Sequence, residues 1–91
     1  MDWRNCLGMR IKPLRIDLLK YLKKRNLVVK YEKQVRFFEV DQKHPSLNTE
    51  ILEPKNLRLY SFRIDRKYRA IFVYLGSEEV EVVDVNDHYQ G

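Results

Sequence analysis

The chain has 91 residues and a mass of 11.1 kDa, enough for a single hydrophobic core and too little for a multidomain enzyme. Apolar residues make up 44% of it, and glycine and proline occur three times each, which excludes disordered and collagen-like proteins. Its single cysteine, Cys6, cannot close an intramolecular disulfide, and no apolar run approaches the roughly 20 residues that span a bilayer. We therefore expect a cytoplasmic protein without a membrane segment.

The charge of the chain is unevenly distributed. The net charge is +5, from 18 basic and 13 acidic residues. Residues 1–76 hold all 18 basic residues and eight acidic ones, a net charge of +10, whereas residues 77–91 hold five acidic residues and no basic one. A positive field attracts polyanions, because neutralised phosphates release their counterions. Nucleic acid is the leading partner class, and the alternative is that the basic residues serve only solubility.

Hydrophobic periodicity predicts a helical hairpin in the first half of the chain. Residues 9–14 are too short for more than a terminal edge strand. From residue 15 to 25, and again from 27 to 40, apolar residues recur at helical spacing. They are Ile16, Leu19 and Leu22 in the first segment and Val28, Tyr31, Val35 and Phe38 in the second. If apolar residues between Leu27 and Tyr31 are exposed, they form a docking groove for a protein partner.

The second half of the chain changes to a period of two, which predicts strands. Pro45 ends the second helix, and an irregular loop is expected to reach about Asn56. Alternating residues then predict three antiparallel strands, at residues 60–64, 68–75 and 80–85.

The predicted fold class is α+β, with a weak first strand and an αα-hairpin packed on one face of a small antiparallel sheet. Residues 1–8 are expected to be an N-terminal extension, and residues 9–91 a single domain. The other face of the sheet remains open to a partner.

Two arginines are predicted to face each other across the first two strands of this sheet. If these strands pair about the Asp65-Arg66 turn, Arg63 and Arg69 lie opposite each other with their side chains on the same face. Two such guanidinium groups repel each other unless an anion lies between them, and they match the geometry of a phosphodiester. The alternative is that each arginine bonds a local carboxylate such as Asp84 or Glu81.

Other candidate residues lie in the loop and after the last strand. His88 and Tyr89 follow the last strand, His44 precedes a proline in the loop, and Glu50 lies just upstream of the strands. A histidine can transfer protons near neutral pH, and a carboxylate can act as a base, but surface and loop-bonding roles stay open for each. The chain contains no Gly-rich phosphate loop, HExxH, CxxC or GxSxG, so no cofactor or metal is expected.

Three stretches of the second half resemble the RelE/ParE superfamily of toxins from bacterial and archaeal toxin–antitoxin systems. They are residues 44–50, from His44-Pro45 to Glu50, residues 60–72, with Arg63 and Arg69, and residues 82–89, ending in His88-Tyr89. The resemblance covers about half of the chain and implies a βααβββ fold. It also implies a ribonuclease that cuts messenger RNA, typically in the ribosomal A site, and a cognate antitoxin that silences it.

The resemblance also implies site residues. The YoeB-like branch uses a loop glutamate, an arginine and a terminal His-Tyr pair, which Glu50, Arg69, His88 and Tyr89 match, while Arg63 matches a basic residue of the preceding strand. The YafQ-like branch uses two histidines that His44 and His88 match, but the chain has Arg63 and Lys67 where that branch has His and Asp. Arg63, Arg66 and Lys67 are accordingly expected to contact RNA phosphates.

These residue types suit RNA cleavage without a metal ion. Glu50 or His44 would take the proton of the 2′-hydroxyl, Arg69 with Arg63 would hold the phosphoryl oxygens, and His88 would protonate the leaving oxygen, with Tyr89 orienting a base. Two other functions stay open: a ParE-like toxin that poisons DNA gyrase through protein contact, and a non-catalytic module that keeps only its antitoxin interface.

Overall fold

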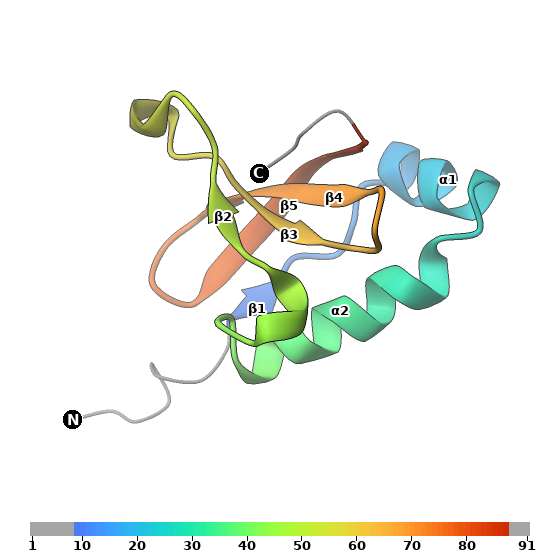
Figure 1. The fold of residues 1–91 in the computed structure, drawn as a ribbon, viewed down its shortest axis with the longest axis horizontal. Helices are drawn as coiled ribbons and strands as arrows, with labels where there is room; N and C mark the ends of the chain where they lie inside the picture. Colours follow the sequence, from blue (N-terminus) through green and yellow to red (C-terminus); the bar gives the residue numbers. More distant parts are fainter. Residues whose placement is uncertain (1–8, 88–91) are drawn as a thin grey trace.

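A computed structural model describes residues 9–87 of the chain; the predicted extension, residues 1–8, and residues 88–91 lie outside this range. Figure 1 shows two helices packed against one twisted sheet. The elements are β1 (Arg10–Ile11), α1 (Ile16–Lys24), α2 (Val28–Val40), the 3₁₀ turn η2 (Pro45–Leu47), β2 (Glu50–Ile51), the 3₁₀ turn η3 (Lys55–Leu57), β3 (Tyr60–Arg63), β4 (Arg69–Tyr74) and β5 (Glu79–Asn86). The α+β class predicted from the sequence is confirmed.

The sheet has five strands in the order β1-β5-β4-β3-β2. Three strand pairs are antiparallel, as predicted for the strands of the second half, but β1 runs parallel to β5, so the sheet as a whole is mixed rather than antiparallel. The irregular loop expected up to Asn56 is also interrupted by β2, which pairs with β3. Both of these edge strands have two residues, too few to produce a readable alternation of apolar and polar side chains.

The two helices end close to where the sequence predicts. The first ends with Lys23 and Lys24 in its last turn, where cations meet exposed carbonyl groups, and Asn26 follows in the left-handed conformation with φ of 59°. Of the apolar residues expected to form a docking groove, Leu27 and Tyr31 are buried in the core and Val29 is exposed. In the described part of the chain, neither helix combines the length and apolarity needed to cross a bilayer.

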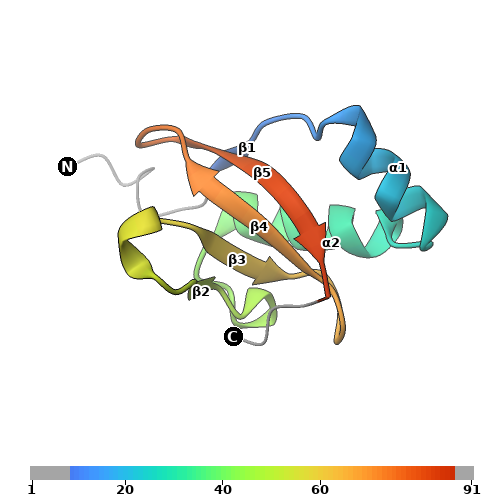
Figure 2. The same cartoon turned by 90° about the horizontal axis from the view of Figure 1, so that it is seen from above.

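Aromatic side chains dominate the core between helix α2 and the sheet. Phe38 of α2, Phe62 of β3 and Phe72 of β4 are fully buried, with ring centroids 5.2–5.8 Å apart. Figure 2 shows that α2 lies behind the sheet, whose opposite face is turned to the viewer. Burial of three large aromatic rings therefore fixes which sheet face is internal and which remains available for a functional site.

One polar residue of α2 joins the helix to the sheet and to the loop. Gln34 is buried, and its Nε2 donates to the backbone carbonyls of Ser46, at 2.9 Å, and Arg63, at 2.7 Å. Its Oε1 accepts from the hydroxyl of Ser46 at 3.1 Å. All of these groups are satisfied, which is the condition under which a buried amide stabilises rather than destabilises a core.

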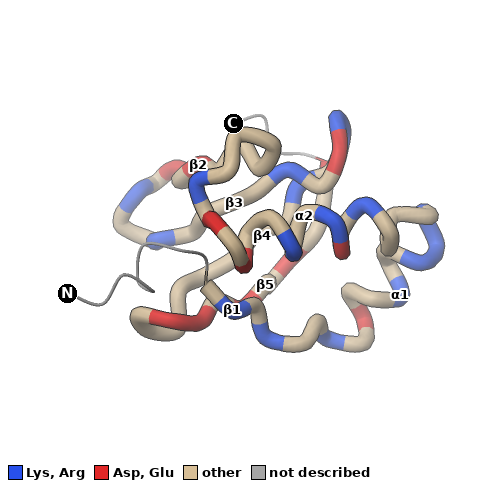
Figure 3. The backbone as a smooth tube through the Cα atoms, turned by 90° about the horizontal axis from the view of Figure 1, so that it is seen from below, with Lys and Arg blue, Asp and Glu red and all other residues tan. Residues whose placement is uncertain are grey.

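The charge asymmetry of the sequence is also an asymmetry in space. Figure 3 shows lysine and arginine recurring along α1 and α2, whereas acidic residues lie along β5. The two helices carry six basic residues, Lys20, Lys23, Lys24, Lys30, Lys33 and Arg36, against three acidic ones, Asp17, Glu32 and Glu39, whereas β5 carries Glu79, Glu81 and Asp84 and no basic residue. A polyanion is therefore attracted to the helical side of the molecule and repelled from β5.

Candidate functional site

The β3–β4 turn places the two predicted arginines opposite each other. Arg63 of β3 and Arg69 of β4 are direct Cα partners in the ladder, as predicted. Asp65 holds the turn between them, since its Oδ1 accepts from the backbone N–H groups of Lys67, at 2.9 Å, and Tyr68, at 2.8 Å. The side chain of Arg63 is exposed, whereas Arg69 is only 7% exposed.

The turn gives the protein a measurable dependence of stability on pH. Burial by itself raises the pKa of Asp65, but hydrogen bonds from the N–H groups of Tyr68 and Lys67, together with the Lys30 ammonium 3.3 Å away, hold this pKa below its ordinary value of 3.8. The carboxylate therefore stabilises the fold above about pH 4, and this contribution is lost as the pH falls through the lowered pKa. Replacing Asp65 with alanine should cost about 1–3 kcal/mol at pH 7.

Urea denaturation of the wild type and of Asp65→Ala at several pH values measures this effect. The difference in free energy of unfolding between the two proteins should shrink as the pH is lowered from 7 to 3. An equal difference at all pH values would show that the charge of Asp65 does not stabilise the turn.

Arg69 is occupied by partners from three neighbouring segments. Its Nε donates to the hydroxyl of Ser61 at 2.9 Å, and its Nη2 donates to the carbonyls of Asn48 and Ser61. The carboxylate of Glu50 lies 3.4 Å from Nη2. An arginine–carboxylate contact, the alternative left open by the sequence, is therefore present for Arg69, but its acid is Glu50 rather than Asp84 or Glu81.

The surroundings of Arg69 hold its guanidinium in one position. The pKa of Arg69 is lowered, mainly by burial and also by the neighbouring Arg63, while Glu50 raises it. The guanidinium nevertheless keeps its proton. Within residues 9–87 its Nη1 group donates no hydrogen bond, which leaves two N–H groups for a ligand. Arg69 is thus a fixed cation whose hydrogen-bonding capacity is only partly used by residues 9–87.

Glu50 carries a buried oxygen that lacks a hydrogen bond. Its Oε1 is shielded from solvent, and its contact with Arg69 is an ion pair without hydrogen-bond geometry. Because β2 pairs Glu50 with Ser61 of β3, the carboxylate lies on the same sheet face as Arg69. An unsatisfied acceptor beside a cation is costly in a purely structural role and is typical of a site that receives a proton donor.

His44 makes the loop hydrogen bond that the sequence left as an alternative to catalysis. It caps η2 through its Nδ1, which accepts from the backbone N–H of Ser46 at 3.1 Å, and its ring stacks on Phe37 with centroids 4.1 Å apart. The hydrogen bond assigns the proton of a neutral ring to Nε2. His44 is consequently a donor toward any ligand, and it can accept a proton at Nδ1 only by releasing its cap.

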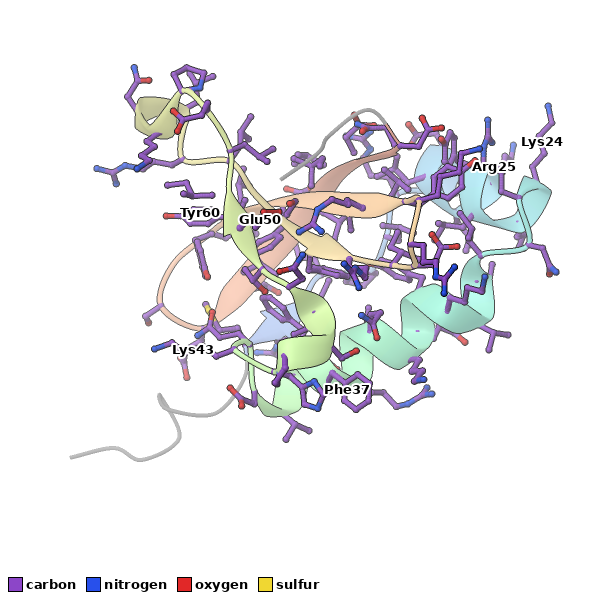
Figure 4. The ribbon with its side chains drawn as sticks, viewed as in Figure 1. Lys24, Arg25, Phe37, Lys43, Glu50 and Tyr60 are labelled. Atoms are coloured by element: carbon purple, nitrogen blue, oxygen red, sulfur yellow. The ribbon has the colours of Figure 1, made fainter. Side chains whose placement is uncertain are left out.

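A cavity of about 600 Å³ lies beside Glu50. It is lined by residues 42–45 and 48–51, including Lys43, His44 and Glu50, and by Tyr60 and Tyr74 of the sheet. Figure 4 shows Lys43, Glu50 and Tyr60 on this side of the molecule, each from a different segment. Cavities of this size and mixed lining are typical of small-ligand sites, and the cavity connects the loop residues of the site with the sheet.

A second cleft, of about 350 Å³, lies between α2 and the end of β3. Its lining includes Lys30, Lys33 and Arg63, together with Gln34 and Ser46. Lys30 forms an ion pair with Asp65. The charges of Lys33 and Arg63 lack an acidic partner in the described part of the chain. This cleft suits the phosphate groups of a nucleic acid strand.

The remaining predicted residues lie at or beyond the margin of the site. Arg66 and Lys67 belong to the exposed β3–β4 turn, and the Nζ of Lys67 lies 3.8 Å from the carboxylate of Asp87. His88 and Tyr89 fall outside the described residues. Among residues 9–87, no three histidine, cysteine, aspartate or glutamate side chains are grouped to hold a metal ion.

Three residues of the site were not predicted from the sequence. Ser61 accepts a hydrogen bond from Arg69, and Gln34 donates one to the loop at Ser46. Tyr74 lines the cavity, and its hydroxyl donates to Oε1 of Gln42 at 2.8 Å. The alternation of side chains along β4 places Tyr74 on the internal face of the sheet with Phe72. A tyrosine at the last position of a strand, on its internal face, is the sequence pattern that could have identified Tyr74 as a cavity residue. Burial and the neighbouring Tyr60 raise the pKa of Tyr74, so its hydroxyl remains a donor at neutral pH.

The fold defined by these elements, which the sequence resemblance implied, is similar to that of solved YoeB and YoeB/ParE toxins. The structure is similar to the YoeB dimer from Staphylococcus aureus, with a TM-score of 0.60 and 18% identity over 92% of this chain and 99% of that one. It is also similar to a YoeB/ParE toxin from Agrobacterium tumefaciens, with a TM-score of 0.59 and 17% identity over 91% of this chain and 100% of that one.

A third similar structure contains a partner. In the heterotetrameric YoeB–YefM toxin–antitoxin complex from Staphylococcus aureus, the matched chain has a TM-score of 0.57 and 17% identity, over 91% of this chain and 98% of that one. The chain matches no protein-family model and no curated protein. At these identities the likeness establishes the fold.

Proposed function

We propose that the protein is the toxin of a toxin–antitoxin system and acts as an endoribonuclease on messenger RNA, in the manner of YoeB. The observation that carries this proposal is the pairing of Glu50 with Arg69 opposite the exposed Arg63, next to a cavity, within the fold of YoeB toxins. A carboxylate and two guanidinium groups supply a base and the cations that a dianionic phosphorane needs.

Each residue of the site receives a role in this proposal. Glu50 takes the proton of the 2′-hydroxyl, because the Nδ1 of His44 is already used by its cap. Arg63 and the free Nη1 of Arg69 bind the phosphoryl oxygens. His88 protonates the leaving 5′-oxygen, Tyr89 orients a base, and His44 donates from Nε2 to the strand. Arg66 and Lys67 attract more distant phosphates.

The proposed partners follow from the same site. A messenger RNA in the ribosome is the substrate, and a cognate antitoxin with acidic residues covers the arginines, as a partner chain accompanies YoeB in the YoeB–YefM complex. The proposed location is the cytoplasm, where both partners are found. No metal or cofactor takes part in the proposed reaction.

Incubating the purified chain with translating ribosomes and mapping the RNA ends tests the proposal. New ends should appear within the messenger, and fewer should appear with His88→Ala. The ends should lie at the codon that occupies the ribosomal A site. Intact RNA together with inhibition of DNA gyrase would overturn the proposal in favour of a ParE-like activity.

A further inference from the structure

The cavity beside Glu50 has features that the proposed cleavage chemistry does not use. Its walls include two tyrosine rings, and Lys43 is the only lysine or arginine that lines it within the described residues. The carboxylate of Glu50 is a further charged group in its lining, and it repels phosphate. A phosphate is therefore poorly accommodated there, whereas a flat, neutral aromatic group is well accommodated.

The rings of Tyr60 and Tyr74 stand nearly perpendicular to each other and form a corner of the cavity. The ring of Tyr60 packs against the buried ring of Phe72 with centroids 5.8 Å apart, so the core holds it in place. Tyr74 is 39% exposed as a residue, and its ring stands at 81° to that of Tyr60, with centroids 5.0 Å apart. A planar ligand in this corner can stack on one ring while its edge meets the other, which is a favourable geometry for aromatic groups.

Hydrogen bonds hold the opposite wall in place. The hydroxyl of Tyr74 donates to Oε1 of Gln42 across a sequence separation of 32 residues, and Oγ1 of Thr49 donates to the Gln42 carbonyl at 3.2 Å. The same loop is braced by the His44 cap on η2. The ring of Tyr74 and the loop are therefore preorganised, which reduces the entropy lost when a ligand binds.

From this geometry we infer that the cavity is a nucleobase-binding subsite, in which a base adjoining the cleaved phosphate stacks on Tyr74 and meets the ring of Tyr60 with its edge. The inference rests on the proposed function, because it assumes that the ligand is a strand of RNA. Polar groups of Gln42, Lys43 and His44 contact the edge of the base. The charge-poor cavity thus takes the base, with Glu50 in its lining, while the cleft at Lys33 and Arg63 takes phosphates.

Titration of the protein with nucleoside 5′-monophosphates, followed by the NMR signals of the tyrosine rings, tests the inference without requiring cleavage. Ribose 5-phosphate is the matched probe that lacks a base. The nucleotides should shift the signals of Tyr60 and Tyr74, and ribose 5-phosphate should not. Equal shifts with ribose 5-phosphate, or nucleotide binding that leaves both rings unaffected, would overturn the inference.

Three variants separate the contributions to the subsite. Tyr74→Leu should weaken nucleotide binding about 5- to 150-fold, the loss expected for one base-stacking ring. Tyr74→Phe keeps the ring and removes only the hydrogen bond to Gln42, so its loss should be smaller. Leu75→Ala changes an exposed neighbour outside the cavity and should bind like the wild type. Equal binding by Tyr74→Leu and the wild type would contradict the stacking role.

The outcome for the subsite is independent of the outcome for the nuclease. A protein that binds nucleotides at these rings but leaves RNA intact would retain the subsite and refute the proposed reaction. A protein that cleaves RNA without any base contact at Tyr60 or Tyr74 would refute the subsite and retain the proposed reaction.

Discussion

Replacing Glu50 with glutamine is expected to slow RNA cleavage about 10²–10⁴-fold while the protein remains folded. The amide has nearly the same shape as the carboxylate, so the β2–β3 pairing is maintained, but it cannot accept the proton of a 2′-hydroxyl. Single-turnover cleavage of RNA on ribosomes measures the rate, and a thermal melt shows that the variant is folded.

Glu53 provides a matched control for Glu50. It is an exposed glutamate three residues further along the same segment, and it does not line the cavity. Glu53→Gln should cleave at the wild-type rate. If Glu50→Gln also cleaved at that rate, Glu50 would not be the base, and His44 would have to release its cap to replace it.

Replacing Arg69 with methionine is expected to lower the free energy of unfolding by about 3–5 kcal/mol, the usual cost of removing one partner from a buried ion pair. The variant leaves the carboxylate of Glu50 without its ion-pair partner, and the hydroxyl of Ser61 and the carbonyl of Asn48 without their donor. Since a small domain is stabilised by about 5–15 kcal/mol, this loss is a large fraction of the total. Chemical denaturation measures it directly.

Arg63 offers a control at the opposite position of the same strand pair. Its side chain is exposed, so Arg63→Met should change stability by no more than about 0.5 kcal/mol. The two variants should therefore differ in stability, although both should impair RNA binding. Equal stability of Arg69→Met and the wild type would show that the buried contacts of Arg69 contribute no net free energy.

The parts of the fold set by local patterns could be predicted from the sequence. Helical spacing gave both helices within one or two residues, and alternation gave β3, β4 and β5. The Asp65-Arg66 turn was sufficient to predict that Arg63 and Arg69 are opposite each other. These features depend on neighbours close in sequence, which periodicity and turn chemistry describe well.

The parts set by distant contacts could not be predicted. The burial of Arg69 depends on Asn48, 21 residues earlier, and the position of Tyr74 depends on Gln42. The parallel pairing of β1 with β5 joins segments almost 70 residues apart. No local pattern encodes such partners, so the sequence identified candidate residues of the sheet but not which of them would be buried.

The side chain of Gln34 also covers part of the margin of the sheet next to β3. The N–H of Ile64 donates toward β4, to the carbonyl of Tyr68, so the carbonyl of Arg63 points the opposite way, past the end of the short β2. Gln34 donates to that carbonyl and occupies the position that a strand of another molecule would need. One acceptor at this margin of the sheet is thereby satisfied within the molecule, which makes the margin a poorer template for a strand of another molecule.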